Sequence, residues 1–476
     1  MSLNRTDFEK FFHPTHIAIV GASTGDYKFG GTSFLMKLQE GGYRGTLYPI
    51  NPKAQEIGGL RAYPDLMSLP EVPDLAMVCV AARLVPLVLE DCARVGLRHI
   101  HILTSGFRET GLAEGILLEQ RIADLAKDHD LKIIGPNCMG PYCPAAGLTA
   151  WGAIPGVSGS VGIISQSGGL TQRLTEYTAS LGIGVNQAVS FGNAAVLDST
   201  DFLQTMAEDE HTRVIVMYLE SVKNARKLLQ ILKAVNRSKP VILWKGGDSL
   251  AGAATAASHT GAMAGSQKLW RAFYRQTGVT RVRSMNECVD AVMALSLLSA
   301  PAGRGVFLVG GGGGNSVAYC DTFNRYGFEV PPLSEATMDF LRRSVPTAGS
   351  IAGNPLDMWR TFIDADYLAQ VLTLGYQDPA VAFIVVDRLI PRMAYHFPDL
   401  TDPTLETIAF LTRHHPVKPT VFTIDSDGGD AELAVTGARL RAQFCRAGIP
   451  SYPSAGRAAR ALGHLYRYHT GHRDAA

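Results

Sequence analysis

The chain has 476 residues, of which 46% are hydrophobic and 18% charged, a composition typical of soluble globular domains. At a prior of roughly 150 residues a domain, the length predicts about three domains. Lys and Arg number 44 and Asp and Glu 43, and a net charge of +1 gives no support for a nucleic-acid or membrane-surface partner.

The sequence shows neither a membrane span nor a metal motif. No run of about 18 apolar residues occurs, and the polar start MSLNRTDFEKFF lacks the apolar core of a signal peptide. The 7 cysteines are scattered and form no CxxC pair, which predicts reduced thiols and no metal site. We therefore expect a cytoplasmic protein.

The first 145 residues alternate short apolar runs with amphipathic stretches. Strands are expected at HIAIVGAS, TLYPINP, LAMVCVA, HIHILTSGF and LKIIGPNCMG, and a helix from about Leu84 to Val95. Helices between successive strands indicate a parallel, doubly wound sheet, so we predict an α/β domain over residues 1–145.

A second series, residues 146–298, opens with SVGIISQSGGL. It continues through an expected loop at Gly184–Ala188, a strand VIVMYLES, a helix near 223–236, a strand PVILWKGG and a helical stretch to about Leu298. After a linker at 299–304, a third series over 304–476 offers GVFLVGGGGGNSV, FEVPPL, VAFIVVDRL, PTVFTID and a terminal helix.

The second and third series resemble each other. Each opens with a strand, a glycine-rich turn and a helix, and each later has an Asn and Asp pair, in GNAAVLD and GNPLD. Two copies of a flavodoxin-like domain would explain this pattern. The alternative is that all doubly wound domains share such units.

The first strand is followed by a loose relative of GxGxxG, with Ser23 and then Gly30–Gly31. Such a turn suits a dinucleotide about as well as CoA, because glycine lets backbone N–H groups approach a phosphate. The second strand ends at Asn51-Pro52-Lys53 and lacks the acidic residue that holds a ribose 2′-hydroxyl. Lys53 suits a phosphate of CoA, or it is a solvated surface residue. The chain contains no Walker A sequence.

His259 lies in a segment of small residues, KGGDSLAGAATAASHTGAMAG. A lone histidine is more often structural than catalytic, but this one is able to approach other backbone closely. An imidazole accepts a phosphoryl group when one nitrogen is free and a partner orients the other. Glu220, after the strand VIVMYL, is a candidate partner, or else a surface glutamate at a strand end.

Two glycine-rich turns are candidates for stabilising a phosphohistidine. Helix N-termini attract anions, and the turns at Ser165-Gln166-Ser167-Gly168-Gly169 and at 311–316 each precede a helix. As pseudo-repeats they could face each other with the histidine between them. The alternative is that both are tight turns without a ligand.

Five segments resemble one known family. SHTGAMAG, SVGIISQSGGL, IGPNCMG, SFGNAA and GNPLD are similar to the matching segments of ADP-forming acetyl-CoA synthetase α subunits, in the superfamily of succinyl-CoA synthetase. The resemblance covers nearly the whole chain. It implies a Rossmann-like CoA-binding domain followed by two flavodoxin-like ligase domains.

The resemblance also implies a reaction. An acyl-CoA and phosphate would give an acyl phosphate and CoA, the acyl phosphate would phosphorylate His259, and the phosphoryl group would pass to a nucleoside diphosphate. By match of position, Glu220 is the partner of His259. The remaining implied residues are phosphate contacts at Ser165, Gln166, Ser167, Gly168, Gly312, Gly313, Gly314 and Asn315, and CoA contacts at Gly21, Ser23, Gly30, Lys53, Val80 and Ala81.

Three departures from the family pattern carry information. The ATP-grasp domains that bind ATP or ADP with Mg²⁺ have no counterpart here, which implies a separate β-type subunit and a hetero-oligomer. The third-domain turn has five glycines where the family usually has Asn-Ala-Gly-Gly-Pro-Gly, and Val196 and Leu197 stand where an acidic residue is usual. Both changes favour a carboxylic acid larger or less usual than acetate.

Two functions of other classes compete with this interpretation. A non-catalytic CoA-binding or regulatory protein could have kept the fold, but the intact SHTG, Glu220 and turns argue against it. A nicotinamide-dependent oxidoreductase would fit the first domain, but the ribose-binding acid is missing and two further domains follow.

Overall fold

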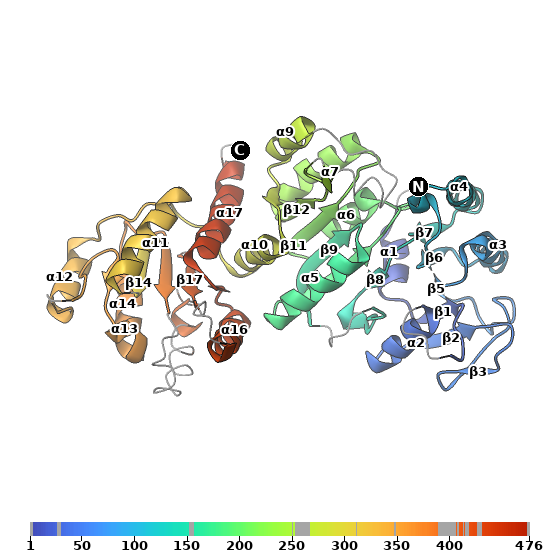
Figure 1. Ribbon diagram of the computed structural model, residues 1–476, viewed down its shortest axis with the longest axis horizontal. Helices are drawn as coiled ribbons and strands as arrows, with labels where there is room; N and C mark the ends of the chain where they lie inside the picture. Colours follow the sequence, from blue (N-terminus) through green and yellow to red (C-terminus); the bar gives the residue numbers. More distant parts are fainter. Residues whose placement is uncertain are drawn as a thin grey trace. The chain divides into compact units, whose positions relative to one another are not determined.

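A computed structural model describes residues 3–25, 30–151, 157–249, 251–252, 267–310, 312–346, 349–388, 406, 409–412, 414, 418–425 and 431–473. Three main sheets follow one another along the chain (Figure 1). The chain divides into two compact units, Met1–Ala179 with Gly184–Ser284, and Ser180–Ile183 with Met285–Ala476. Across the described ranges, no helix has the length and apolar character needed to cross a membrane.

The first sheet has the strand order β2-β1-β5-β6-β7, and all its strands are parallel. Its apolar strands are buried on both faces, as expected for a sheet covered by helices. The strands are β1 (His16–Val20), β2 (Thr46–Ile50), β5 (Leu75–Val78), β6 (His99–Ile102) and β7 (Lys132–Ile134), with a small hairpin of β3 (Glu56–Ile57) and β4 (Leu60–Arg61). The helices are α1 (Arg5–Phe12), α2 (Gly31–Glu40), α3 (Val85–Val95) and α4 (Ala113–Asp128), with short turns η1 (Ala82–Leu84), η2 (Arg108–Thr110) and η3 (Pro144–Ala146).

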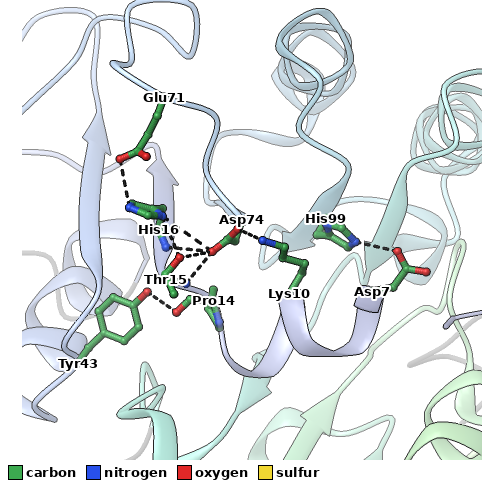
Figure 2. A network of polar contacts seen from close by, with 9 residues as sticks. All are labelled: Asp7, Lys10, Pro14, Thr15, His16, Tyr43, Glu71, Asp74 and His99. Atoms are coloured by element: carbon green, nitrogen blue, oxygen red, sulfur yellow. Dashed lines mark hydrogen bonds and ion pairs between the residues drawn. The ribbon is translucent and has the colours of Figure 1, made fainter. Parts of the chain in front are cut away.

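A polar network fastens α1 to the first sheet (Figure 2). Asp74, just before β5, accepts hydrogen bonds from Lys10 of α1 and from the backbone N–H of Thr15, the latter at 2.7 Å. His99 at the start of β6 contacts Asp7 of α1 at 3.0 Å. These contacts hold α1 at the edge of the sheet opposite to the carboxyl ends of the strands.

The second sheet has the order β13-β12-β11-β9-β10-β8, with only β8 antiparallel to its neighbour. Its strands are β8 (Gly140–Tyr142), β9 (Ser158–Ser165), β10 (Val185–Ser190), β11 (Val214–Leu219), β12 (Val241–Lys245) and β13 (Thr280–Val282). Its helices are α5 (Gly168–Ser180), α6 (Ser199–Glu208), α7 (Ala225–Ser238) and α9 (Gln267–Thr277).

The segment between β10 and α6 packs against the first sheet. The N–H of Ala195 donates to the carbonyl of Gly135 at 2.9 Å, and that of Leu197 to Ile133 at 3.2 Å. Leu197 is fully buried, and Val196 packs against the apolar core of the first sheet. The apolar character of these two residues thus has a packing role between the two sheets.

The third sheet has the order β15-β14-β16-β17-β18 and is parallel throughout. Its strands are β14 (Val306–Gly310), β15 (Leu356–Asp357), β16 (Phe383–Asp387), β17 (Thr420–Thr423) and β18 (Ser451–Tyr452). The helices of this unit are α10 (Met285–Leu297), α11 (Gly313–Arg325), α12 (Glu335–Ser344), α13 (Arg360–Ile363), α14 (Ala365–Gln377), α16 (Ala431–Arg446) and α17 (Ala455–Arg473).

The parallel strands of the second and third sheets have one topology. Numbered from β9 and from β14, both run 2-1-3-4-5, the flavodoxin-like order. The predicted α/β class with parallel, doubly wound sheets is confirmed. In each sheet the first strand lies between the second and the third, so the loops after these three strands meet at one crevice.

Two expected elements are wrong. Gly184–Ala188 was expected as a loop, but Val185–Ser190 forms the buried strand β10. FEVPPL was expected as a strand, but only Glu329 forms an isolated bridge, with Gly305, because two prolines follow and donate no backbone hydrogen bonds.

The predicted domain ranges stay a prediction, to which the packing adds two facts. β8 lies within the predicted first domain but pairs with β10 of the second sheet. α10 lies within the predicted second domain but packs on α17 in the unit of the third sheet.

Candidate functional site

The predicted CoA contacts lie in loops at the carboxyl end of the first sheet. Gly21 follows β1, Lys53 follows β2, and Val80 follows β5. Because β1 lies between β2 and β5, these loops meet where parallel sheets most often bind ligands. The structure therefore brings the three predicted segments to one place.

Contacts within these loops explain their sequence. Gly21 has φ +97°, and a Cβ there would lie 2.9 Å from the carbonyl carbon of Cys79. Asn51 donates a side-chain hydrogen bond to the carbonyl of Ala22 at 2.7 Å, which joins the loops after β1 and β2. The N–H of Ser23 donates to Oγ1 of Thr32 in α2 at 2.8 Å.

The other predicted CoA residues differ in their surroundings. Gly30 precedes α2 with φ +107°, and a Cβ there would meet no described atom within 4 Å. Lys53 is exposed. The carbonyl of Val80 accepts a hydrogen bond from Thr104 at 2.7 Å, and Ala81 precedes η1. The N-terminus of α2 is a position where a helix attracts an anion.

The turn after β9 presents backbone N–H groups at the start of α5. Oγ of Ser165 accepts the N–H of Ser167 at 3.1 Å, and Oγ of Ser167 accepts the N–H of Leu170 at 3.3 Å. The N–H groups of Gly168 and Gly169 lie in the first turn, where a helix supplies no acceptor. A Cβ on Gly168 would lie 2.5 Å from Cγ of Met139, so the turn packs closely there.

Gln166 joins this turn to the end of β11. Its Oε1 accepts the N–H of Glu220 at 2.5 Å and that of Ser221 at 2.9 Å, and its Nε2 donates to Oγ of Ser221 at 3.1 Å. Gln166 and Glu220 are 7% and 8% exposed. The structure therefore brings Glu220 and the predicted Ser165–Gly168 turn together. His259 lies outside the described residues.

Sequence inspection missed Tyr218 and Lys245 beside Glu220. The hydroxyl of Tyr218 donates to Oε1 of Glu220 at 3.2 Å. Lys245 ends β12, donates to the carbonyl of Gly246, and lies 5.4 Å from the ring centroid of Trp270. Burial lowers the pKa of Lys245, against the attraction of Asp248 and Glu220. The sequence feature that could have pointed to Lys245 is a lysine at the end of an apolar strand.

The second glycine-rich turn follows β14. Gly310 has φ +127°, and a Cβ there would lie 2.4 Å from the carbonyl oxygen of Asp387. Gly312 precedes α11, and its N–H donates to Oδ1 of Asp357 at 2.9 Å. Of the four predicted phosphate residues here, Gly312 already has an acceptor, and Gly313, Gly314 and Asn315 form the first turn of α11. This turn and the α5 turn belong to different compact units.

Metal-ligand geometry does not occur in the part of the chain that the structure describes: no group of three or more His, Cys, Asp or Glu side chains there could hold an ion.

Comparisons with known proteins agree with the architecture. The CoA binding domain family matches residues 15–144, and the family of succinyl-CoA ligase-like flavodoxin domains matches residues 158–295. Acetate–CoA ligase [ADP-forming] I subunit alpha of Pyrococcus furiosus is 34% identical over 97% of this chain and 97% of its own length. Acetate–CoA ligase [ADP-forming] I of Archaeoglobus fulgidus is 35% identical over 74% of this chain, which spans only half of that relative.

A solved structure shows the same likeness in three dimensions. The dinucleotide forming acetyl-coenzyme A synthetase 1 of Ca. Korarchaeum cryptofilum, in complex with phosphate and ADP, superimposes with a TM-score of 0.84 at 29% identity, covering 98% of each chain. Similarity of this extent, together with both domain matches, shows that the chain belongs to the ADP-forming acyl-CoA synthetases, a family of acid–thiol ligases, in which it corresponds to the α subunit.

Proposed function

We propose that this chain interconverts a carboxylic acid, CoA and a nucleoside triphosphate with acyl-CoA, nucleoside diphosphate and phosphate, through phosphorylated His259. The observation that carries the proposal is the joining of Glu220 to the Ser165–Gly168 turn by Gln166. A buried carboxylate beside a helix N-terminus offers an imidazole both an orienting acceptor and a place for its phosphoryl group.

In the direction of acyl-CoA use, phosphate oxygen attacks the thioester carbonyl, the C–S bond breaks, and CoA leaves as its thiol. The imidazole of His259 then attacks the phosphorus of the acyl phosphate, and the carboxylate leaves with the bridging oxygen. Glu220 would hold the N–H of the other ring nitrogen, which favours the attacking tautomer. Transfer to the nucleoside diphosphate regenerates the free imidazole.

CoA fits the crevice of the first sheet. The open N-terminus of α2 at Gly30 and the exposed Lys53 offer two positive features for its pyrophosphate and 3′-phosphate. Gly21, Ser23, Val80 and Ala81 would line the approach. When bound, CoA supplies the thiol that forms and releases the thioester.

We further propose an ATP-grasp β-type subunit that binds ATP or ADP with Mg²⁺, and a hetero-oligomer with it. The Pyrococcus furiosus relative is named a subunit alpha, and its length is matched almost completely. We place the enzyme in the cytoplasm, since all 7 cysteines are free thiols. The acid is proposed to be larger than acetate, on the strength of the five-glycine turn.

The test is phosphoryl labelling with γ-labelled nucleoside triphosphate in the presence of an ATP-grasp subunit. The wild type should acquire acid-labile, base-stable label, and His259→Ala should acquire none. Glu220→Gln should label at least tenfold more slowly, by the loss of a charge-assisted hydrogen bond. His211→Ala, at an exposed histidine, is the matched control and should label normally. Persistent label on His259→Ala would refute the assignment.

A further inference from the structure

Asp387 is a buried carboxyl that neither the reaction scheme nor the sequence motifs use. It ends β16, the middle strand of the third sheet, and is 3% exposed. Its Oδ1 accepts hydrogen bonds from the hydroxyls of Tyr319 at 2.8 Å and Thr423 at 3.0 Å. Its Oδ2 has no hydrogen-bond partner among the described residues. A buried oxygen without a hydrogen-bond partner carries a substantial desolvation cost, and a bound ligand that hydrogen-bonds to Oδ2 of Asp387 would offset this cost.

The position of Asp387 indicates where that ligand would lie. β14 has β15 on one side and β16 on the other, so the ends of β14 and β16 flank the topological switch point of the sheet. Asp387 lines a cavity of about 10 Å³ there together with Gly310, Ser316 and Tyr319. Such a volume holds a single oxygen-sized atom.

Ser316 and Tyr319, which line this cavity, belong to α11, and the first turn of this helix supplies hydrogen-bond donors. The backbone N–H groups of Gly313, Gly314 and Asn315 open α11, a helix of 13 residues, and have no acceptor within it. The positive end of the helix attracts an anion. A ligand on this turn with one oxygen in the cavity would satisfy both the N–H groups and Asp387.

The protonation of Asp387 follows from its surroundings. Burial raises its pKa most, and the charge of Asp425 adds to this, while the hydroxyls of Tyr319 and Thr423 act in the opposite direction. Among the described residues, Asp357 on β15 also lies at this turn, where its Oδ1 accepts the N–H of Gly312, and Arg388 follows Asp387 directly in the chain. Because Oδ1 already accepts two hydroxyl hydrogens, the proton of the neutral carboxyl belongs on Oδ2.

We propose that Oδ2–H of Asp387 donates a hydrogen bond to an oxyanion held by the N–H groups of Gly313, Gly314 and Asn315. The oxyanion is a carboxylate or a phosphoryl group, both of which the proposed reaction contains, and the inference rests on that function for its physiological ligand. Asp387 is then a specificity-determining residue. In its ionised form it would repel the same ligand, so binding weakens as pH rises through its folded pKa.

The test uses the full chain without partner or nucleotide. Backbone amide chemical shifts of Gly313 and Gly314 are followed while inorganic phosphate or acetate is added. Acetate is fully ionised above about pH 6, so any further pH dependence of its affinity belongs to the protein. The phosphate series is compared between variants at one pH. The stronger of the two responses identifies the ligand class.

Two substitutions separate the outcomes. The Asp387→Asn variant would keep an acceptor for Tyr319 and Thr423 and place a permanent N–H₂ donor at the Oδ2 position, so its affinity should be independent of pH. Asp387→Leu lacks the donor and should bind about tenfold more weakly at low pH. Asp378→Asn, at a carboxyl of the same unit that accepts from Ser334 and Thr337, is the control and should keep the wild-type pH profile.

An unchanged pH profile in Asp387→Asn, or full affinity in Asp387→Leu, would overturn the proposal. Should Asp387→Leu fail to fold, Asp387→Asn alone decides the question. Failure of His259 labelling would leave these amide shifts unaffected, so the two proposals fail separately.

Discussion

Asp74 shows at the scale of one residue how polar contacts anchor a helix to a sheet. The carboxylate receives donors from Lys10 and from both the N–H and the hydroxyl of Thr15 (Figure 2). Burial acts to raise its pKa, but the hydrogen bonds and the charge of Lys10 outweigh burial and lower the pKa from 3.8 to about 2. The folded state thus stabilises the ionised form of Asp74.

This shift predicts a pH-dependent stability. Because the pKa of Asp74 is lower in the folded state, the ionised carboxylate stabilises the protein at pH values above the unfolded pKa of 3.8. This stabilisation is lost as the pH falls towards the folded pKa of about 2. Asp74→Asn should therefore lower the free energy of unfolding by about 2 kcal/mol at neutral pH and have little effect near the folded pKa. Urea unfolding measured across this pH range tests it, with the exposed Asp128→Asn as control. An equal loss at both ends of the range would contradict it.

The residues of the candidate site differ in how far sequence could predict them. Ser165 and Gln166 were predicted because they belong to a glycine-rich turn before a helix, and Glu220 because it follows an apolar strand at the edge where parallel sheets bind ligands. The bridging role of Gln166 was not predicted, because its partners lie 54 and 55 residues away. Asp387 was missed for the same reason: Tyr319 and Thr423, which decide where its proton lies, are 68 and 36 residues distant.

At the scale of elements, most strands and helices were predictable from alternating apolar and amphipathic runs. β10 was not, because Gly184 directly precedes the strand and Asn186 within it has low strand propensity. Asn186 is nevertheless buried in the sheet, where its side chain donates to Oγ1 of Thr212 at 2.9 Å. Tertiary contacts overrode local preference there, and no local pattern reports such contacts.

The pair of helices α10 and α17 depends on a buried ion pair. Asp290 of α10 is 1% exposed and accepts two hydrogen bonds from Arg457 of α17, at 2.7 and 2.8 Å, and a longer one from Arg460 at 3.3 Å. Removing one partner of a buried pair leaves an uncompensated charge. Because Arg460 remains, Arg457→Ala should cost about 2 kcal/mol, less than for an isolated pair.

The measurement is urea unfolding followed by circular dichroism, with Arg342→Ala as the matched control. Arg342 pairs with Glu335 on the surface of the same unit, and loss of an exposed pair costs less than about 1 kcal/mol. If the two substitutions lowered the free energy of unfolding equally, the pair of Asp290 and Arg457 would contribute no more than an exposed ion pair.

At the scale of the whole molecule, the three main sheets each have a candidate ligand site in the loops at the carboxyl ends of their parallel strands. The first is proposed for CoA, the second for the phosphoryl group on His259, and the third for an oxyanion beside Asp387. The sequence predicted a ligand-binding turn in each of the three regions, because each begins with a strand and a glycine-containing turn, but it assigned the second and third turns to one phosphohistidine. How the two compact units are arranged during the reaction depends on contacts between distant segments, which no motif encodes.

The proposed ATP-grasp subunit predicts that ligation requires more than this chain. Calorimetry should show that it binds CoA, and Lys53→Ala should weaken CoA more than dephospho-CoA if the lysine contacts the 3′-phosphate. Lys127→Ala, at an exposed lysine of α4, should leave both affinities unchanged. Ligation should appear only after an ATP-grasp subunit is added, with a larger particle in analytical ultracentrifugation. Robust ligation by the chain alone would refute the missing-subunit proposal.

The contact between α10 and α17 also bears on how the chain acquires its structure during synthesis. Asp290 and Arg457 are 167 residues apart, so the ion pair cannot form until the ribosome has passed α17. The first compact unit closes at Ser284 and has no such requirement. The first unit can therefore fold on the ribosome before α17 has been synthesised. During that interval the apolar face of α10 lacks its packing partner α17, and chaperones that bind exposed apolar surface would recognise it.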